Sequence, residues 1–154
     1  MPERFGPRDE KFTVLWVCCG FRLYRGAVPT TVLIVEDEPD LAKVMALAIG
    51  RAGFHVLTVG TGADARAAVS RSTVDVVVMD RGLPDMDGLE ATASLREDGF
   101  LGAVVVTSGQ AGPDHVAACL GAGADDVLGK PFGLADLVAR VRSSIRPATV
   151  PEAG

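Results

Sequence analysis

Four polar spots that could take part in chemistry each follow a short, mostly apolar run. They are Glu36-Asp37 after residues 31–35, Asp80 after residues 74–79, Thr107-Ser108 after residues 103–106, and Lys130-Pro131 after residues 125–129. Loops at the carboxyl ends of parallel strands share one edge of a sheet, so distant residues can converge there. We therefore predict one crevice that holds three carboxylates, a hydroxyl and an ammonium.

Three carboxylates held close together repel one another and raise one another's pKa unless a cation joins them. Oxygen ligands favour Mg²⁺, and because the set contains neither His nor Cys, zinc is not expected. A carboxylate beside Mg²⁺, with Lys130 to neutralise charge and Thr107 to hold an oxygen, could accept a phosphoryl group. Asp80 is the predicted acceptor because it alone ends an apolar strand. Glu36 and Asp37 are the predicted metal ligands, with the Gly82 carbonyl as a further oxygen.

The elements that must position these residues alternate regularly after residue 30. The pattern predicts strands at 31–36, 54–59, 74–80, 103–107 and 125–128, and helices at 39–51, 63–70, 89–97, 113–120 and 133–145. In the first helix Leu41, Val44, Met45 and Ala48 have the spacing of one apolar face. Five strand–helix units in one short stretch predict an α/β sandwich built on a parallel sheet.

Composition narrows the class of protein. The chain has 154 residues, 48% of them hydrophobic, which is enough for one domain with a substantial core. Residues 31–154 contain ten basic and seventeen acidic residues, an acidic balance that disfavours direct binding of nucleic acid. The apolar stretch at 12–21 is too short to span a membrane, and a signal peptide fits poorly. Three cysteines do not form a disulfide framework, so we expect a reducing, cytoplasmic setting with Cys119 on an apolar helix face.

The chain resembles the receiver domain of two-component response regulators. The resemblance rests on four motifs in order, over about residues 31–146: Val35-Glu36-Asp37-Glu38-Pro39; Met79-Asp80 leading to Leu83-Pro84-Asp85-Met86-Asp87-Gly88; Thr107-Ser108; and Gly121-Ala122-Gly123-Ala124-Asp125-Asp126 followed by Lys130-Pro131-Phe132. It implies a flavodoxin-like (βα)5 three-layer sandwich with a parallel sheet of order 2-1-3-4-5.

The resemblance also implies roles for the site residues. Asp80 would be the phosphoacceptor, Mg²⁺ would be held by Asp37, Asp80 and the Gly82 carbonyl, with Glu36 helping through water, and Lys130 would pair with a phosphoryl oxygen. The Lys130-Pro131 bond is expected to be cis. The phosphodonor would be a sensor histidine kinase or a histidine phosphotransfer protein, and the output would be contact with a protein target. Such a domain is not an enzyme in the usual sense, since it promotes only its own phosphorylation and dephosphorylation.

One position departs from the family pattern. An aromatic residue usually stands three residues before the lysine and turns inward on activation, whereas Val127 stands there and is expected to be a core residue. A receiver-like interaction module that works without phosphorylation is therefore the alternative function. Arg81 is expected to point outward, and His115 and Arg140 are expected to be exposed on the output surface. Gly82 and Gly109 leave the mouth of the site uncovered.

A competing motif and the two chain ends complete the sequence-based picture. The run from Gly60 to Ala65 formally fits a dinucleotide fingerprint, but it follows the second strand and leaves Lys130 unexplained. We expect three parts: residues 1–30 as an N-terminal extension that is non-native or flexible, 31–147 as the receiver domain, and 148–154 as a short tail, which indicates a stand-alone receiver. For residues 1–30, the two hypotheses are a native start at residue 28 or a segment that covers a patch or binds a partner. The sequence is also compatible with a homodimer.

Overall fold

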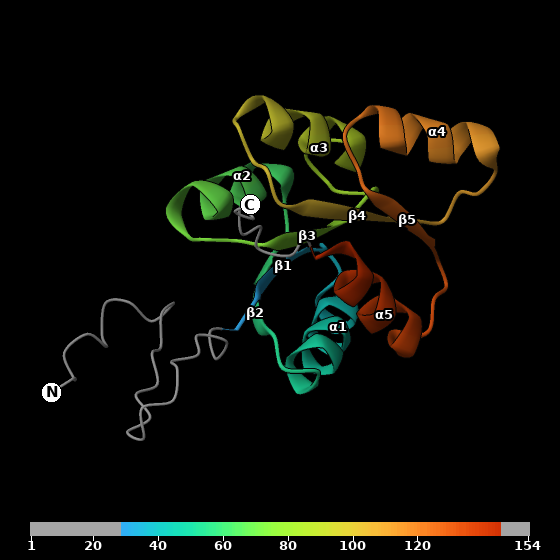
Figure 1. Ribbon diagram of the computed structural model, residues 1–154. Helices are drawn as coiled ribbons and strands as arrows, with labels where there is room; N and C mark the ends of the chain where they lie inside the picture. The colour runs from blue at the N-terminus through green and yellow to red at the C-terminus, as the bar shows by residue number, and fades with distance from the viewer. Residues whose placement is uncertain (1–28, 146–154) are drawn as a thin grey trace, which may run out of the picture. The chain divides into compact units, whose positions relative to one another are not determined.

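Five parallel strands form one sheet in the order β2-β1-β3-β4-β5 (Figure 1). In this computed structural model, residues 29–145 are described. The strands are β1 (Thr31–Val35), β2 (His55–Val59), β3 (Val76–Asp80), β4 (Ala103–Ser108) and β5 (Asp126–Gly129). This order and the alternation with helices confirm the predicted flavodoxin-like sandwich.

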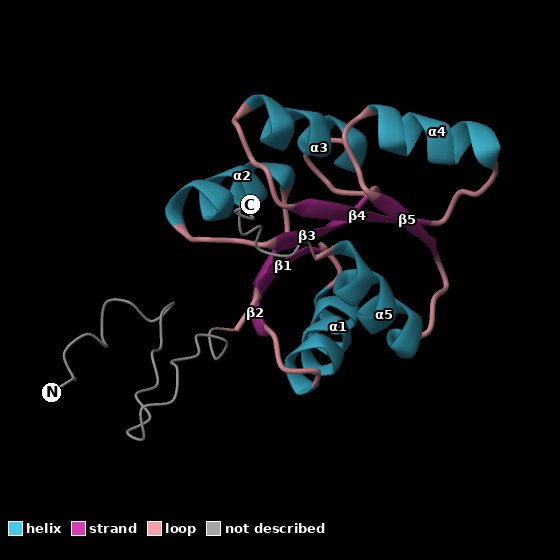
Figure 2. Cartoon of the chain, in the orientation of Figure 1, coloured by secondary structure: helices cyan, strands magenta, loops and turns pink. Residues whose placement is uncertain are grey.

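Helices cover both faces of the sheet, as Figure 2 shows. They are α1 (Pro39–Arg51), α2 (Gly62–Arg71), α3 (Gly88–Glu97), α4 (Pro113–Gly121) and α5 (Leu134–Ser144). Helices α1 and α5 lie on one face, and α2, α3 and α4 lie on the other. Each predicted element is present, with ends displaced by at most about two residues, which is the usual uncertainty of helix and strand boundaries.

The three central strands are valine-rich because both of their faces are buried. Every residue of β1, β3 and β4 is buried, and β-branched side chains pack well on a pleated surface. Alternate side chains enter two apolar clusters, one under α1 and α5 around Ile34 and Val78, the other under α2, α3 and α4 around Leu33 and Val77. These clusters hold the strands rigidly, so the residues at their carboxyl ends have fixed positions.

The first helix buries a narrower face than its sequence suggested. Met45 and Ile49 are buried in the core, whereas Val44 is 43% exposed, so the prediction that Val44 belongs to the core face is wrong. The buried stripe runs through Leu41, Met45 and Ile49, at intervals of four residues. Cys119, by contrast, is fully buried on α4, as predicted.

Some sequence-based expectations concern residues outside the described part of the chain. The predictions about residues 1–28 and the tail at 148–154 lie there. Among residues 29–145, the structure contains no helix that is both long and apolar enough to cross a lipid bilayer.

Gly88 offers a test of how tightly the fold holds the end of β3. A Cβ at this position would collide with the Asp80 carbonyl oxygen and would lie 2.7 Å from the Arg81 Cα. We expect Gly88→Ala to destabilise the protein by about 1–3 kcal/mol, because backbone must move to admit the methyl group. The measurement is the free energy of unfolding in urea.

Gly50→Ala is the matched control, since a Cβ there would meet nothing within 4 Å and the residue lies in α1. It should leave stability unchanged or raise it by up to about 1 kcal/mol. Equal stability of the two variants would contradict the tight packing at Gly88.

Candidate functional site

The strand register brings the predicted residues to one edge of the sheet. Asp80, the last residue of β3, is the direct partner of Thr107 on β4, and Gly129 of β5 pairs with Ser108. Glu36 follows β1, and its amide donates to the Val59 carbonyl of β2 at 3.0 Å. The predicted convergence of the four polar spots is confirmed.

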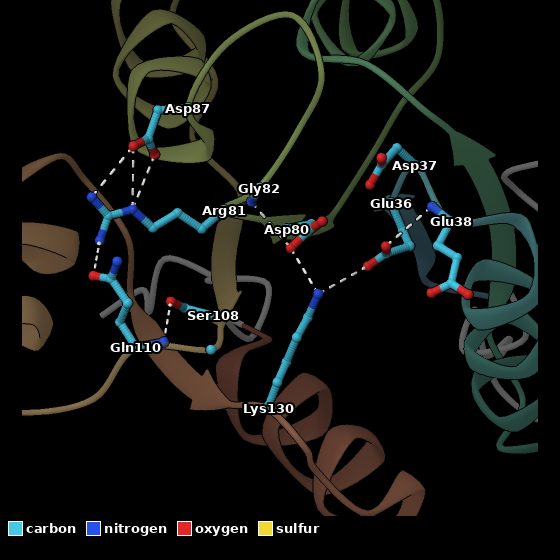
Figure 3. A pocket seen from close by; sticks show the side chains of 11 residues that line it. Glu36, Asp37, Glu38, Asp80, Arg81, Gly82, Asp87, Ser108, Gln110 and Lys130 are labelled. Atoms are coloured by element: carbon cyan, nitrogen blue, oxygen red, sulfur yellow. Dashed lines mark hydrogen bonds and ion pairs between the residues drawn. The ribbon is translucent and has the colours of Figure 1, made fainter.

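Lys130 joins the carboxylates of two different strands. Its Nζ lies 2.8 Å from Asp80 Oδ1 and 3.5 Å from Glu36 Oε1. Figure 3 shows this side chain reaching from the end of β5 toward both acids. The Lys130-Pro131 peptide bond is cis, as expected.

Burial and charge act together on the titration of these groups. Burial, and after it the charge of Asp80, raises the pKa of Glu36, although the Glu38 amide and Lys130 act in the opposite direction. Burial disfavours the ammonium form of Lys130, but its hydrogen bond to Asp80 and the charges of Asp80 and Glu36 outweigh burial and raise the pKa of Lys130. The site therefore concentrates negative charge that one lysine only partly neutralises.

The residues present fit a divalent cation. Ligand oxygens of Glu36, Asp37 and Asp80 can all lie within 4.8 Å of one another, and Asp37 is the exposed member. Glu36 Oε1 is buried and accepts no hydrogen bond; its nearest positive charge is the ammonium at 3.5 Å. A buried carboxylate oxygen without a donor, beside two further carboxylates, is the environment that a hard cation relieves.

Thr107 lies behind the residues that line the pocket and does not line it itself. The residue is fully buried, and its Oγ1 has no hydrogen-bond partner among the described residues. A buried hydroxyl without a partner costs free energy, which an oxygen-bearing group on Asp80 could recover. The next residue, Ser108, lines the site and accepts a hydrogen bond from the Gln110 amide at 3.0 Å.

The site opens to solvent through a pocket of about 580 Å³. Gly82 and Gly109 line it, and a Cβ at either position would meet nothing within 4 Å, so no side chain narrows the mouth there. Val127 lies on β5, the edge strand next to β4. It packs against the core cluster that contains Cys119 but is only partly buried, so the expected core packing is confirmed in part.

Arg81 does not point outward, which corrects the expectation from the sequence. Its side chain is 24% exposed and forms a side-on ion pair with Asp87, with Nε 3.1 Å from Asp87 Oδ1 (Figure 3). Burial acts against ionisation of Asp87, but the Leu89 amide and the Arg81 guanidinium prevail and lower the pKa of Asp87. Asp87 also caps α3, and this Asp-Gly pair before a helix was a signal that could have been recognised.

The two residues expected on the output surface differ in exposure. His115 is buried, at 9% exposure, so its predicted exposure is wrong. It contacts Arg81 and lies 3.6 Å from Cys119 Sγ through Nε2. Arg140 is half-buried and pairs with Asp126 at 2.8 Å, also donating to the Val127 carbonyl at 3.0 Å.

The structure gives the glycine motif at residues 60–65 an ordinary role. The amides of Gly62 and Ala63, at the start of α2, donate to the Asp85 carboxylate at 2.9 and 3.1 Å. A Cβ on Gly62 would also lie 2.7 Å from Met86 Sδ. A protein carboxylate thus occupies the position that a pyrophosphate would need, which argues against dinucleotide binding. Sequence reasoning missed Asp85 as this cap.

Comparisons with known proteins point to one family. A family model described as the response regulator receiver domain matches residues 32–142. Transcriptional regulatory protein KdpE of Mycobacterium tuberculosis is 39% identical over 121 residues, which cover 78% of this chain and 53% of KdpE. The probable transcriptional regulatory protein TcrX of the same organism is 42% identical, with 77% of this chain and 50% of TcrX covered. This chain therefore spans about half the length of the curated relatives that it matches.

Solved structures agree with this match. The BeF3-activated N-terminal receiver domain of Klebsiella pneumoniae RstA superposes with a TM-score of 0.71 at 27% identity, covering 76% of this chain and 99% of that domain. The signal receiver domain of a LuxO repressor protein from Vibrio parahaemolyticus gives a TM-score of 0.71 at 26% identity, covering 75% and 89%.

Removing the lysine should expose the electrostatic cost of the site. With a chelator present, we expect Lys130→Gln to lower the free energy of unfolding at about pH 7.5 by about 1–3 kcal/mol, because two buried carboxylates lose their cation. The pKa of Glu36 is already raised, so the folded protein holds this proton more tightly than the unfolded chain does. Stability of the variant should therefore recover as the pH falls toward the pKa of Glu36.

The measurement is urea unfolding at about pH 7.5 and about pH 5.5, because the raised pKa of Glu36 favours its protonation in the folded protein as the pH falls. Lys43→Gln, which removes an exposed lysine on α1, is the control and should show neither effect. A loss of stability that is the same at both pH values would contradict the electrostatic explanation.

Proposed function

Since this chain belongs to the response regulator receiver domain family, we propose that it accepts a phosphoryl group on Asp80 in an Mg²⁺-dependent reaction. The observation that carries the proposal is the meeting of Asp80 with Lys130 at 2.8 Å, next to two further carboxylates at the open edge of the sheet. At this distance the Lys130 ammonium can neutralise the negative charge that a phosphoryl group would add to Asp80.

Each neighbouring group has a part in this reaction. Asp37, Asp80 and the Gly82 carbonyl would hold Mg²⁺, with Glu36 helping through water, and the ion would neutralise charge on the phosphoryl oxygens. Lys130 shifts from Asp80 to a phosphoryl oxygen, while the buried Thr107 hydroxyl gains an acceptor that it otherwise lacks. Ser108, which is small, leaves room for the phosphoryl group to enter.

The phosphodonor is a sensor histidine kinase or a histidine phosphotransfer protein, in keeping with the family. The domain is not an enzyme that acts on a separate substrate; it promotes its own phosphorylation and dephosphorylation. Output passes by contact with a protein, through the surface of α4, β5 and α5. KdpE and TcrX are named as transcriptional regulators, a property that belongs to those proteins.

Intact mass measurement tests the phosphorylation of Asp80. With Mg²⁺ and excess acetyl phosphate, we expect the parent protein to gain one phosphoryl group, and Asp80→Asn to gain none, because an amide oxygen is a poor nucleophile. A chelator should abolish the gain. Asp64→Asn, which changes an exposed aspartate on α2, should behave like the parent. A gain that survives in Asp80→Asn would place the acceptor elsewhere.

The open mouth of the site predicts a short-lived phosphoryl aspartate. Because neither Gly82 nor Gly109 covers the pocket, attacking water enters freely, and we expect hydrolysis well within hours in the isolated protein. Gly109→Gln should lengthen the half-life several-fold, since the open space at this position admits a side chain that shields the site. The control is Gly50→Ala, distant on α1. A half-life of many hours in the parent protein would refute the prediction.

A further inference from the structure

Helix α4 is anchored by smaller or more polar buried side chains than α1 and α5 are. Its buried side chains are His115 and Cys119, whereas α1 buries Met45 and Ile49, and α5 buries Leu137 and Val141. Gly112, with a φ of 110°, precedes α4, and no side chain caps its first turn, a feature that α4 shares with α1 and α5. An element with few buried apolar contacts changes position at a low cost in free energy.

Polar contacts that begin at the functional site help to hold α4 in place. Arg81 directs Nε and Nη2 to Asp87, while Nη1 contacts Nδ1 of His115 and lies 3.5 Å from Gln110 Oε1. A guanidinium can only donate, so Nδ1 of His115 accepts and Nε2 carries the proton. That N–H faces Cys119 Sγ at 3.6 Å. The contacts thus run from the loop after Asp80 into the buried face of α4.

The same arginine contacts the end of β4 and, through Gln110, the loop that follows it. The Arg81 amide donates to the Thr107 carbonyl at 2.9 Å, and the Gln110 amide donates to Ser108 Oγ at 3.0 Å. A movement of residues 107–110 toward a group on Asp80 therefore displaces the partners of Arg81. Arg81 thus contacts both the segment 107–110 and, through His115, the first turn of α4.

We propose that Arg81 is a positioning residue that links the chemical state of Asp80 to the position of the first turn of α4 through its contact with His115. The proposal rests on the proposed phosphorylation of Asp80. In the unphosphorylated protein the contact holds the start of α4 against the loop after β3. When residues 107–110 move, the contact weakens and α4 shifts, although Val127 provides no ring to turn inward.

Two variants and their combination test this link. Arg81→Gln shortens the side chain and removes its charge, and His115→Phe removes the Nδ1 acceptor but keeps a planar ring. Arg66→Gln is the matched control, because it breaks an exposed arginine–aspartate pair between α2 and Asp98. The readouts are hydrogen exchange of the α4 amides without phosphodonor, their NMR shifts with Mg²⁺ and excess acetyl phosphate, and the intact mass.

We expect α4 amides to exchange about fivefold faster in Arg81→Gln and His115→Phe, while α1 amides stay as in the parent. The change in α4 shifts on phosphorylation should fall to less than half of the parent's in either variant. The double variant should show no larger effect than the larger single one, because both remove the same contact. Arg66→Gln should match the parent throughout.

The outcomes separate the link from the function on which it rests. If the parent gains no phosphoryl group, the proposed function fails and the link fails with it. If the parent and Arg81→Gln are both phosphorylated and the α4 response is unchanged, the link alone is overturned. Additive effects in the double variant would also overturn it. If the α1 amides of His115→Phe also exchange faster than in the parent, this variant is destabilised as a whole. The comparison of Arg81→Gln with Arg66→Gln then decides the test.

Discussion

The concentration of carboxylates around Asp80 is the constraint on which the rest of the structure depends. Parallel register places Glu36, Asp37 and Asp80 at one edge, and like charges at this spacing repel. Lys130 bridges two of them, yet the pKa of Glu36 stays raised and one of its oxygens accepts no hydrogen bond. The site is thus incompletely neutralised as it stands, so a cation or a change in charge on Asp80 acts on it strongly.

Such a site persists only because its supports are rigid. The buried strands β1, β3 and β4 hold their ends in fixed register, and Gly88 packs so closely that no side chain fits between α3 and the end of β3. Asp85 accepts hydrogen bonds from the first two amides of α2, and Asp87 caps α3, so the loop after Asp80 is held at two points. The unfavourable electrostatics are therefore confined to a few side chains, while the surrounding apolar packing supplies the stability.

The sequence predicted the fold and the acidic site because both depend on patterns local to each strand. Apolar runs lead to Glu36, Asp80, Thr107 and Lys130. If the strands are parallel, these residues all lie at the same edge of the sheet. The errors at Val44, Arg81 and His115 have another cause. Helix α4 is apolar around much of its circumference, with Val116 and Leu120 exposed, so its pattern does not identify the face that packs on the sheet. The direction of Arg81 depends on partners 6 and 34 residues away, which no local pattern shows.

Two of the errors, at Arg81 and His115, fall in the part of the molecule that the proposed link requires to move. Residues in regular packing follow from periodicity, whereas Arg81, Gln110 and His115 interact through polar contacts between loops and a lightly anchored helix. Polar contacts of this kind contribute little net free energy each, so a change at Asp80 is large enough to alter them. Val127 fits this view, because a small, partly buried residue on β5 fills space but has no ring that could turn inward. Under the proposed link, a change at Asp80 reaches α4 through Arg81, which contacts His115 on that helix.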